Sequence, residues 1–399
     1  MALTGYVTGN MTQVTTLATE QMPDVDKYLY LLEPYQTPVL QWLYFSQGMN
    51  KAQAVTNAEA LFYWFEDELV AHQTTLSGAG IAGGSTSEDN IGLTDKTWIN
   101  EGDILLVEAT NQMIYVDSTI SSEIDITILD NSTNITAATS GYVKKIGSRN
   151  NEFAGVRTGV FTKPVRKENY CTISSESVTT TGRYQAADFY TNGMTHKEQV
   201  NKKTTEMKLQ FERQFLFSTT SGAVTDSSVY RTTWGKGFYG FVTTNSVSFD
   251  SVLSEQAFDD FLMRVFSAKG SSRRKRMYAG MTLINRINNF VKKGGSYRVD
   301  SVAYEYGIKL ERYYTPFGLL ELVWDPVFDG KFADYGFVMD EKGIKLRYMA
   351  NDMKGSRKFR IENGVETPGT DGETTKLLAD VGIQVYNEEM HGILYNSAA

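Results

Sequence analysis

The strongest periodic pattern of hydrophobic positions lies in the middle of the chain, where apolar side chains recur at helical spacing over 195–217. Thr195 and Glu198 open this segment as a T-x-x-E capping box, in which each side chain accepts a hydrogen bond from the other residue's amide. A Ser/Thr cluster and Gly222 end the segment. The pattern predicts one long helix with a buried apolar face and a partly solvated polar face. The apolar face comprises Val200, Met207, Phe211 and Phe215, and the polar face comprises Lys203, Glu206, Lys208, Glu212 and Arg213.

Short strands are the prevailing pattern before this helix. Leu61–Phe65 is a dense apolar and aromatic run that predicts a strand, and Ser77–Ser87 is rich in glycine and serine, which predicts a mobile loop rather than core. Within 92–148, β-branched runs alternate with turn residues and predict a small all-β insertion of about four strands. These runs are 98–109, 112–118, 123–129 and 142–147.

Helix and strand signals alternate after the central helix. Ser254 is a typical N-cap for a helix that closes at Gly270, and a shorter helix is predicted from Thr282 to Gly294. Strands are predicted around 299–306, 319–324 and 336–339. In the tail, Val381, Ile383 and Val385 alternate with smaller or polar residues, which predicts a last strand docked on a sheet. This succession is typical of the α+β class.

The first 55 residues have a different character. Pro23, Pro34 and Pro38 interrupt any long helix there, so we expect an extended arm with one short helical stretch. The N-terminus lacks a basic start and a continuous apolar block, so no secretory signal is expected, and we give no weight to the N-x-[ST] matches. Those matches are at Asn10, Asn131 and Asn134. The apolar runs are too short to span a bilayer, and 399 residues suffice for about two or three domains.

Residues with catalytic or metal-binding chemistry are few. Cys171 is the only cysteine and forms no internal disulfide. The chain has three histidines, far apart in sequence: His72, His196 and His391. In the acidic run Glu66–Glu68, a strand would place its first and last carboxylates on one face, but a solvated edge explains the run better than acid–base chemistry does. We predict no catalytic, cofactor-binding or metal-binding residue and no enzymatic activity.

Two further motifs resemble nucleotide or nucleic-acid sites. Gly235–Gly240 reads GKGFYG and matches G-x-G-x-x-G, but a β-branched, loop-like segment follows instead of the required helix, so a glycine-rich turn is predicted. Ser271–Met277 reads SSRRKRM, which we interpret as a solvated loop leading into an apolar segment. The formal net charge of -8 also argues against a general nucleic-acid binder.

The order of these parts resembles the major capsid proteins of tailed bacteriophages with the Hong Kong 97 fold, and the resemblance covers nearly the whole chain. Its motifs, in order, are LEPYQTPVL at Leu32–Leu40, FYWFEDEL at Phe62–Leu69, INEGDILLV at Ile99–Val107, GYVKKIG at Gly141–Gly147, ENYCTI at Glu168–Ile173, FERQFLFSTTSG at Phe211–Gly222 and LADVGIQVYNEEMHGILYN at Leu378–Asn396. The segment before the first motif is short, so no fused scaffolding segment is expected, and a separate scaffolding protein or prior cleavage remains open.

This resemblance implies an α+β capsid fold with five parts. They are an N-terminal arm at 1–55, an extended loop at 56–165 with a β insertion at about 92–148, a peripheral domain at 166–245 with a spine helix at 195–217, an axial domain at 246–350, and a return to the peripheral domain with a C-terminal strand at 351–399.

The implied function is structural. Copies would assemble in the host bacterial cytoplasm as hexamers and pentamers, forming the icosahedral or prolate head of a virion. Implied partners are a portal protein, a separate scaffolding protein, decoration proteins, and double-stranded DNA contacted on the inner face without sequence specificity; no membrane is implied. One alternative is an encapsulin-like nanocompartment shell, against which the β insertion argues. Another is an enzyme or binding module, which would form a small oligomer rather than a particle.

Overall fold

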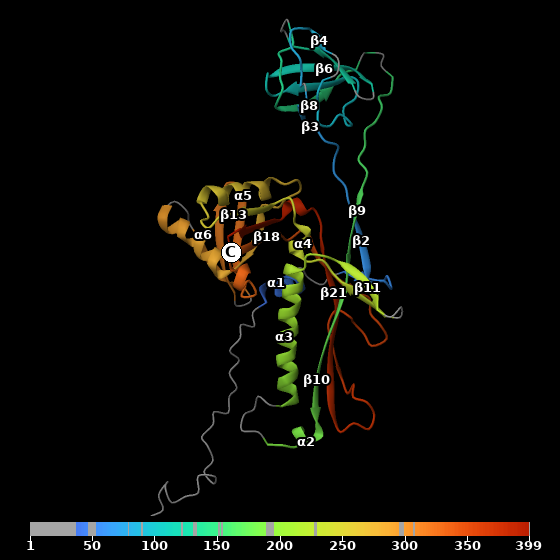
Figure 1. Ribbon diagram of the computed structural model, residues 1–399, viewed down its shortest axis with the longest axis vertical. Helices are drawn as coiled ribbons and strands as arrows, with labels where there is room; N and C mark the ends of the chain where they lie inside the picture. Colours follow the sequence, from blue (N-terminus) through green and yellow to red (C-terminus); the bar gives the residue numbers. More distant parts are fainter. Residues whose placement is uncertain are drawn as a thin grey trace, which may run out of the picture. The chain divides into compact units, whose positions relative to one another are not determined.

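The computed structural model describes residues 37–46, 53–78, 80–88, 91–120, 123–130, 134–150, 152, 155–188, 195–226, 230–294, 299–305 and 308–398 (Figure 1). The chain divides into two compact units. The insertion unit is Phe65–Lys167, and the main unit joins Met1–Trp64 to Glu168–Ala399. Most of the predicted arm, including Pro23 and Pro34, lies outside the described residues.

The first described elements of the main unit are short. Helix α1 (Pro38–Gln41) begins at a proline, whose fixed φ suits the first helical position, and a single π-helical turn, Trp42–Ser46, follows it. This predicted short helical stretch is therefore present. Its apolar side chains are buried in the largest hydrophobic cluster of the main unit: Val39, Leu40, Trp42 and Leu43.

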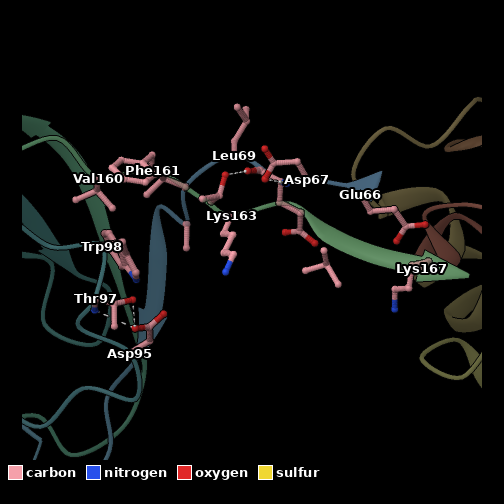
Figure 2. Close-up of a pocket in the computed structure, with 15 residues that line it drawn as sticks. Glu66, Asp67, Leu69, Asp95, Thr97, Trp98, Val160, Phe161, Lys163 and Lys167 are labelled. Atoms are coloured by element: carbon pink, nitrogen blue, oxygen red, sulfur yellow. Dashed lines mark hydrogen bonds between the residues drawn. The ribbon is translucent and has the colours of Figure 1, made fainter. Parts of the chain in front are cut away.

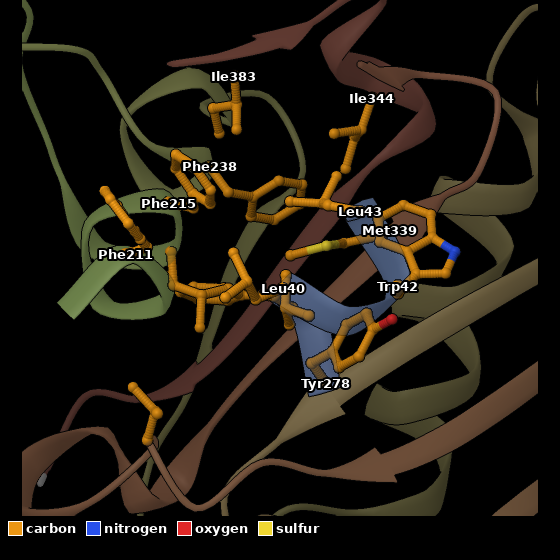
Figure 3. Packing of buried hydrophobic residues seen from close by; sticks show 14 of the residues in the cluster. Leu40, Trp42, Leu43, Phe211, Phe215, Phe238, Tyr278, Met339, Ile344 and Ile383 are labelled. Carbon is orange, nitrogen blue, oxygen red and sulfur yellow. The ribbon is translucent and has the colours of Figure 1, made fainter. Parts of the chain in front are cut away.

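The long helix predicted in the middle of the chain is confirmed as α3 (His196–Phe217). The Thr195 hydroxyl accepts a hydrogen bond from the Glu198 amide at 3.4 Å, as expected of the cap. Figure 3 shows the apolar face of α3, where Phe211 and Phe215 stack with ring centroids 6.2 Å apart and pack into the same cluster as α1. Met207 is buried with them, and Val200 is half-buried.

The predicted polar face of α3 is wrong at one position, Glu212, whose side chain is fully buried. Glu212 lies one helical turn before the buried Leu216 and so shares its face. Its Oε1 atom accepts the Val39 N–H of α1 at 2.8 Å. The sequence pattern misplaced this carboxyl because its hydrogen-bond donor comes from a segment 173 residues away.

A five-stranded sheet runs beside α3 (Figure 1). Its order is β1-β19-β21-β10, and β20 also pairs with β21. The strands are β1 (Gln53–Val55), β10 (Thr172–Thr181), β19 (Ile344–Met349), β20 (Arg360–Asn363) and β21 (Gly372–Val385). Strand β21 contains the predicted tail strand, but it is buried continuously from Leu377 to Val385 rather than on alternate residues. One reason is that Gly382 lies against Phe62 and Tyr170, so the second face of β21 is covered as well.

The second sheet of the main unit has seven strands in the order β13-β22-β18-β14-β17-β16-β15. The strands are β13 (Ser246–Phe249), β14 (Arg274–Ala279), β15 (Val299–Glu305), β16 (Ile308–Thr315), β17 (Gly318–Trp324), β18 (Tyr335–Asp340) and β22 (Gly392–Asn396). The predicted helices are confirmed as α5 (Glu255–Ser267), capped by Ser254, and α6 (Met281–Gly294). Both lie beside this sheet in Figure 1.

The end of the chain contributes strands to both sheets. The last strand, β22, lies in the seven-stranded sheet, parallel to β13 and antiparallel to β18. Its residues Ile393 and Leu394 are buried in two different hydrophobic clusters, one on each side of the sheet. The tail therefore joins both sheets of the main unit: β21 belongs to one and β22 to the other.

Shorter elements complete the main unit. They are β2 (Leu61–Glu66) paired with β9 (Val165–Tyr170), the hairpin β11 (Gly222–Asp226) and β12 (Tyr230–Trp234), the one-turn helices α2 (Gly182–Gln185) and α4 (Phe238–Phe241), and the 3₁₀ turns Gly330–Asp334 and Glu388–Met390. Strand β2 confirms the predicted strand at Leu61–Phe65, and β2 and β9 carry the chain into and out of the insertion unit.

The insertion unit is a six-stranded sheet in the order β3-β8-β5-β6-β7-β4. Its strands are β3 (Gln73–Thr75), β4 (Ser87–Glu88), β5 (Asp103–Val107), β6 (Gln112–Ile120), β7 (Glu123–Ile128) and β8 (Tyr142–Ser148). The four predicted strands are all present, and two short ones join them. The unit has a hydrophobic cluster of its own, which includes Leu105, Ile114, Val116, Ile126 and Val143.

The glycine-rich segment Ser77–Ser87 was predicted to be a mobile loop rather than core; residues 82–87 are exposed, but Ile81 is part of the core. Ile81 is 2 % exposed in the core of the insertion unit and exchanges two backbone hydrogen bonds with Ala138, of 2.7 and 3.0 Å. A Cβ atom at Gly80 would lie 2.1 Å from the Ala138 carbonyl oxygen. The glycine therefore serves close packing of two backbones rather than flexibility.

Candidate functional site

The acidic run Glu66–Glu68 lines a cavity of about 550 Å³ within the insertion unit, together with Lys163 and Lys167 (Figure 2). We expected strand alternation to place Glu66 and Glu68 on one face. Strand β2 ends at Glu66, so this alternation does not extend to Glu68. Glu68 is exposed, and its amide donates to the Asp67 carboxylate at 2.9 Å. The run is a solvated edge facing two lysines, which agrees with the interpretation drawn from the sequence.

Apolar side chains surround the same cavity and point into solvent. Leu69 is 91 % exposed and Phe161 is 88 % exposed, and Figure 2 shows both at the rim of the cavity. Phe65, near the end of β2, and Val165, the first residue of β9, are also exposed. Single exposed apolar residues are ordinary. A group of large ones on the two segments that flank one cavity marks a surface for protein contact.

Cys171 and the histidines do not form a reactive site. Cys171 is fully buried, and burial together with the nearby Asp380 carboxylate raises the pKa of its thiol to about 12, so the thiol stays protonated at neutral pH. His72 is exposed, whereas His196 lies between the hydroxyls of Thr180 and Thr375 at 2.9 Å from each. The structure brings none of these groups together.

Close packing accounts for the glycines of the motif Gly235–Gly240. A Cβ atom at Gly237 would lie 2.6 Å from the Gln214 carbonyl, and one at Gly240 would lie 2.5 Å from the Thr219 carbonyl. The short helix α4 (Phe238–Phe241) begins within the motif, has a single turn and packs against α3. The motif is therefore a close backbone contact, in line with the predicted glycine turn.

The basic run Ser271–Met277 is not the solvated loop that its charge predicted. Strand β14 begins within it, at Arg274, and occupies the interior of the seven-stranded sheet between β17 and β18. Lys275 is fully buried and Arg276 is 8 % exposed. The prediction failed because acidic partners from distant strands neutralise these cations inside the protein. One local signal did indicate a buried strand: the apolar stretch Met277–Ala279, which continues β14 directly after the basic residues.

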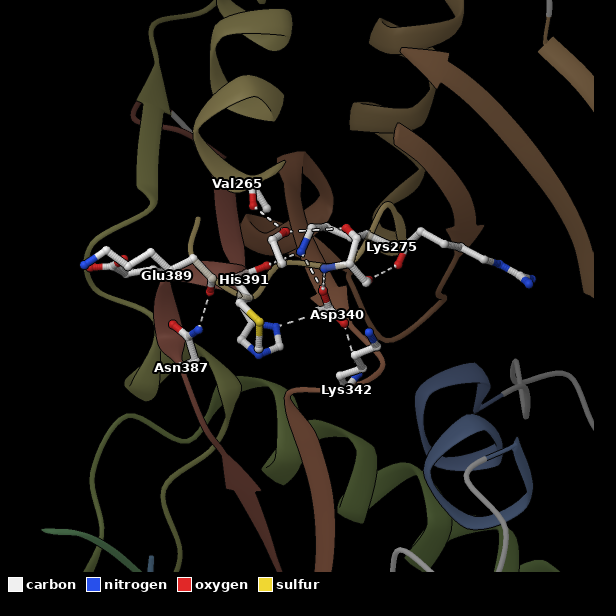
Figure 4. Close-up of polar contacts among 12 residues, drawn as sticks. Val265, Lys275, Asp340, Lys342, Asn387, Glu389 and His391 are labelled. Atoms are coloured by element: carbon white, nitrogen blue, oxygen red, sulfur yellow. Dashed lines mark hydrogen bonds and ion pairs between the residues drawn. The ribbon is translucent and has the colours of Figure 1, made fainter. Parts of the chain in front are cut away.

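Lys275 belongs to a buried polar network (Figure 4). Its Nζ atom lies 2.8 Å from Asp340 Oδ2 and donates to the Met390 carbonyl at 2.7 Å. Asp340 also accepts the amides of Ser272 and Lys342 at 2.8 and 3.0 Å. Burial favours the neutral acid, but the hydrogen bond from Lys275 and these amides outweigh it and lower the pKa of Asp340. The carboxylate is ionised and fully satisfied.

His391 completes this network as a neutral side chain. Its Nδ1 atom accepts the Asp340 N–H at 3.1 Å, and its ring meets Phe238 edge-on with centroids 5.4 Å apart. Burial, assisted by the Lys275 ammonium, lowers the pKa of His391 to about 3. The network thus joins β14, β18 and the turn before β22, and its role is to hold the last strand in the seven-stranded sheet.

A second buried carboxylate, Glu321 on β17, meets several cations. Arg274 Nη2 lies 2.6 Å from Glu321 Oε1, Arg276 Nε lies 3.0 Å from Glu321 Oε2, and Arg312 Nε is 3.8 Å from Oε1. Three neighbouring strands, β14, β16 and β17, supply these side chains. The basic run therefore stabilises the sheet internally.

Replacing Lys275 by alanine is expected to lower the free energy of unfolding by about 3–5 kcal/mol, because Asp340 would stay buried without its counter-ion. Urea or thermal denaturation of purified protein measures the loss. Lys342→Ala removes the side chain of an exposed lysine whose backbone amide contacts the same carboxylate; it is the matched control and should change stability by less than about 0.5 kcal/mol. Equal stability of Lys275→Ala and the unmodified protein would contradict the assigned ion pair.

Groups of acidic, histidine and cysteine side chains that suit a metal ion are absent from the described residues. Among the helices of those same residues, none combines the length and the apolar composition of a membrane span. What the geometry offers is a set of buried polar anchors in the main unit and an exposed apolar rim on the insertion unit.

Comparisons with known proteins bear on this arrangement. The family model of the SU10 major capsid protein matches residues 7–398. No curated protein matches the chain. Among solved structures, the chain is similar to a chain of Microbacterium phage Oxtober96, with 8% identity, 98% of this chain and 100% of that chain covered, and a TM-score of 0.44.

Two more structures are similar over a smaller part. Mycobacterium phage Patience shows 13% identity over 63% of this chain and 76% of its own, with a TM-score of 0.44. The SrpI encapsulin of Synechococcus elongatus shows 12% identity over 59% and 77%, with a TM-score of 0.43. Similarities at this level carry no argument by themselves, so the assignment rests on the family match.

The family match spans nearly the whole chain, and the described elements follow the order expected of an α+β capsid fold of the Hong Kong 97 type, which is thereby confirmed. A major capsid protein is a structural component of the virion that assembles in many copies, and the buried networks described above have structural roles. This chain belongs to the SU10 major capsid protein family and is a non-enzymatic shell subunit of a phage head.

Proposed function

We propose that copies of this chain form the hexamers and pentamers of an icosahedral or prolate head that encloses double-stranded DNA. The observation that carries the proposal is the insertion unit, which has a hydrophobic core of its own yet exposes large apolar side chains on the segments that lead into and out of it. Leu69 and Phe161 are the most prominent of these. Such side chains gain stability only when another protein surface covers them, and in a shell that surface belongs to a neighbouring copy.

The five parts expected from the sequence receive these roles in the proposal. The insertion unit is the extended loop with its β insertion and reaches a neighbouring copy. Helix α3 with the five-stranded sheet is the peripheral domain, and the seven-stranded sheet with α5 and α6 is the axial domain. The N-terminal arm makes further contacts between copies.

Other partners in the proposal are a portal protein, a separate scaffolding protein, decoration proteins and the packaged DNA, with assembly in the host bacterial cytoplasm. Contact with DNA is without sequence specificity. Lys275 and Arg276 of the basic run Ser271–Met277 take no part in this contact, because they are paired with buried carboxylates. The formal net charge of -8 agrees with a weak interaction between the chain and phosphate groups.

Electron microscopy of the expressed full-length protein tests the proposal. We expect closed shells or tubes, alone or with a co-expressed scaffolding protein from the same virus, because each subunit must bury surface against several neighbours. Light scattering of the same samples gives the particle mass. Monomers or small oligomers at high protein concentration under both conditions would contradict the proposed assembly.

A further inference from the structure

Two buried carboxyl groups meet where three distant segments of the main unit come together. Glu212 lies on α3 and Asp325 directly follows β17, and both side chains are 0 % exposed. The two carboxyl groups lie close enough for a proton on one of them to form a hydrogen bond with the other. Helix α1 packs against the same place, and Figure 3 shows its Leu40 between Phe211 of α3 and Tyr278 of β14, with Trp42 beside Tyr278.

Each carboxyl group has one oxygen with an ordinary partner and one without. Glu212 Oε1 accepts the Val39 N–H at 2.8 Å, and Asp325 Oδ1 accepts the Val327 N–H at 2.9 Å. Glu212 Oε2 and Asp325 Oδ2 are buried and receive no hydrogen bond from an amide, hydroxyl or ammonium group. Two ionised carboxylates only accept hydrogen bonds and repel each other, so contact between them requires a proton on one of the two.

We propose that Glu212 and Asp325 share a single proton, and that this proton fastens α1 to the spine helix and to the end of β17 until rising pH removes it. Glu212 is then the remote N-terminal cap of α1, because the expected capping residue, Thr37, makes no side-chain hydrogen bond there. With the proton lost, two like charges would lie in contact without water. The pair would separate, and α1 would lose its cap or its place in the core.

The groups that face the pair offer little compensation for a second negative charge. Helix α1 contributes backbone amides and apolar side chains, and none of Pro38–Gln41 is ionisable. Strand β14 contributes the Tyr278 hydroxyl, which burial keeps protonated. Arg276 lies two residues before Tyr278 on that strand, and its Nε atom lies 3.0 Å from Glu321 Oε2. Neither α1 nor the two β14 side chains named above, Tyr278 and Arg276, therefore supplies a positive charge that could replace the shared proton.

The direction of the pH dependence follows from these surroundings. Burial raises the pKa of Glu212, and it raises that of Asp325 to about 7. The folded pair therefore holds a proton that the unfolded chain releases near pH 4. Its stabilising effect is complete below that pH and is lost as pH rises through the folded value. Between about pH 4, where the unfolded chain releases the proton, and the folded pKa of about 7, the unfolding constant should rise about tenfold per pH unit, because the folded state binds one proton more than the unfolded state.

Glu212→Gln is the decisive variant, because its amide keeps an oxygen for Val39 and supplies a permanent hydrogen for Asp325. Hydrogen exchange of the full-length protein, corrected for the intrinsic pH effect, reports on the amides of residues 39–42. Between pH 5 and 8 we expect their protection to fall at least about tenfold in the unmodified protein and to stay constant in Glu212→Gln. At pH 5 the infrared difference spectrum, unmodified protein minus variant, should contain the band of one protonated carboxyl group.

Asp325→Asn should behave as Glu212→Gln does, since its amide donates toward Glu212 in the same way. Glu206→Gln, on an exposed position of α3, is the matched control and should keep the pH response of the unmodified protein. The proposal is overturned if Glu212→Gln retains that response, or if no protonated carboxyl band distinguishes the two proteins. Loss of folding in one variant leaves the other to decide, because each removes the shared proton on its own.

Discussion

Phe211→Asp and Phe215→Asp are each expected to prevent folding of the subunit. Both phenyl rings are 3 % exposed in the cluster that joins α3 to α1 and to the two sheets. An aspartate there would bury an unpaired carboxylate and leave a void, at a cost above about 5 kcal/mol. That is a large share of the ~5–15 kcal/mol that stabilises a domain. Circular dichroism and the soluble fraction after expression measure the effect.

Gln210→Asp is the control, because Gln210 is exposed on the same helix. It changes charge and helix propensity in the same direction and should lower stability by less than about 1 kcal/mol. Soluble, well-assembled particles from Phe211→Asp or Phe215→Asp would show that the apolar face of α3 does not lie in the core as described.

Deletion of residues 69–161, with Glu68 joined to Thr162 by two glycines, is expected to leave a folded subunit that forms no shells. The main unit keeps its own hydrophobic clusters and the β2–β9 pair, none of which depends on the deleted sheet. Assembly should fail because the proposed contact with a neighbouring copy is gone. Cooperative thermal unfolding checks the fold, and electron microscopy checks the particles.

Two controls separate loss of contact from damage at the junction. Inserting two glycines after Glu68 and two before Thr162, with the insertion unit retained, should preserve shells. The isolated insertion unit, Phe65–Lys167, should fold alone as a β protein, since it has a separate core. Normal particles from the deletion variant would contradict the proposed role of the insertion unit.

Much of the secondary structure could be predicted from the sequence because its signals are local. The cap at Thr195, the cap at Ser254 and the turn-bounded β-branched runs all became elements at the expected places. A capping box or a hydrophobic period involves residues within one or two turns of each other, so no distant contact is needed to recognise it. The resemblance to tailed-phage capsid proteins rested on the order of these same local features.

The errors share one physical origin. Glu212 and Lys275 were expected in solvent because their charge is costly to bury, and Ile81 of Ser77–Ser87 was expected outside the core because glycine is flexible. The structure supplies each with a partner far along the chain: Val39 for Glu212, Asp340 for Lys275 and, for the glycine segment, the backbone around Ala138.

The sequence by itself determined which segments of this protein form helices and strands, and through their order it indicated the capsid fold. Only the tertiary structure decided which polar groups are buried, which sheet receives the last strand, and that Glu212 and Asp325 meet. The physical reason is that burial of a charge is settled by the partner that compensates it. For Lys275 that partner is 65 residues away, and for Glu212 the donor is 173 residues away, beyond the reach of any local pattern.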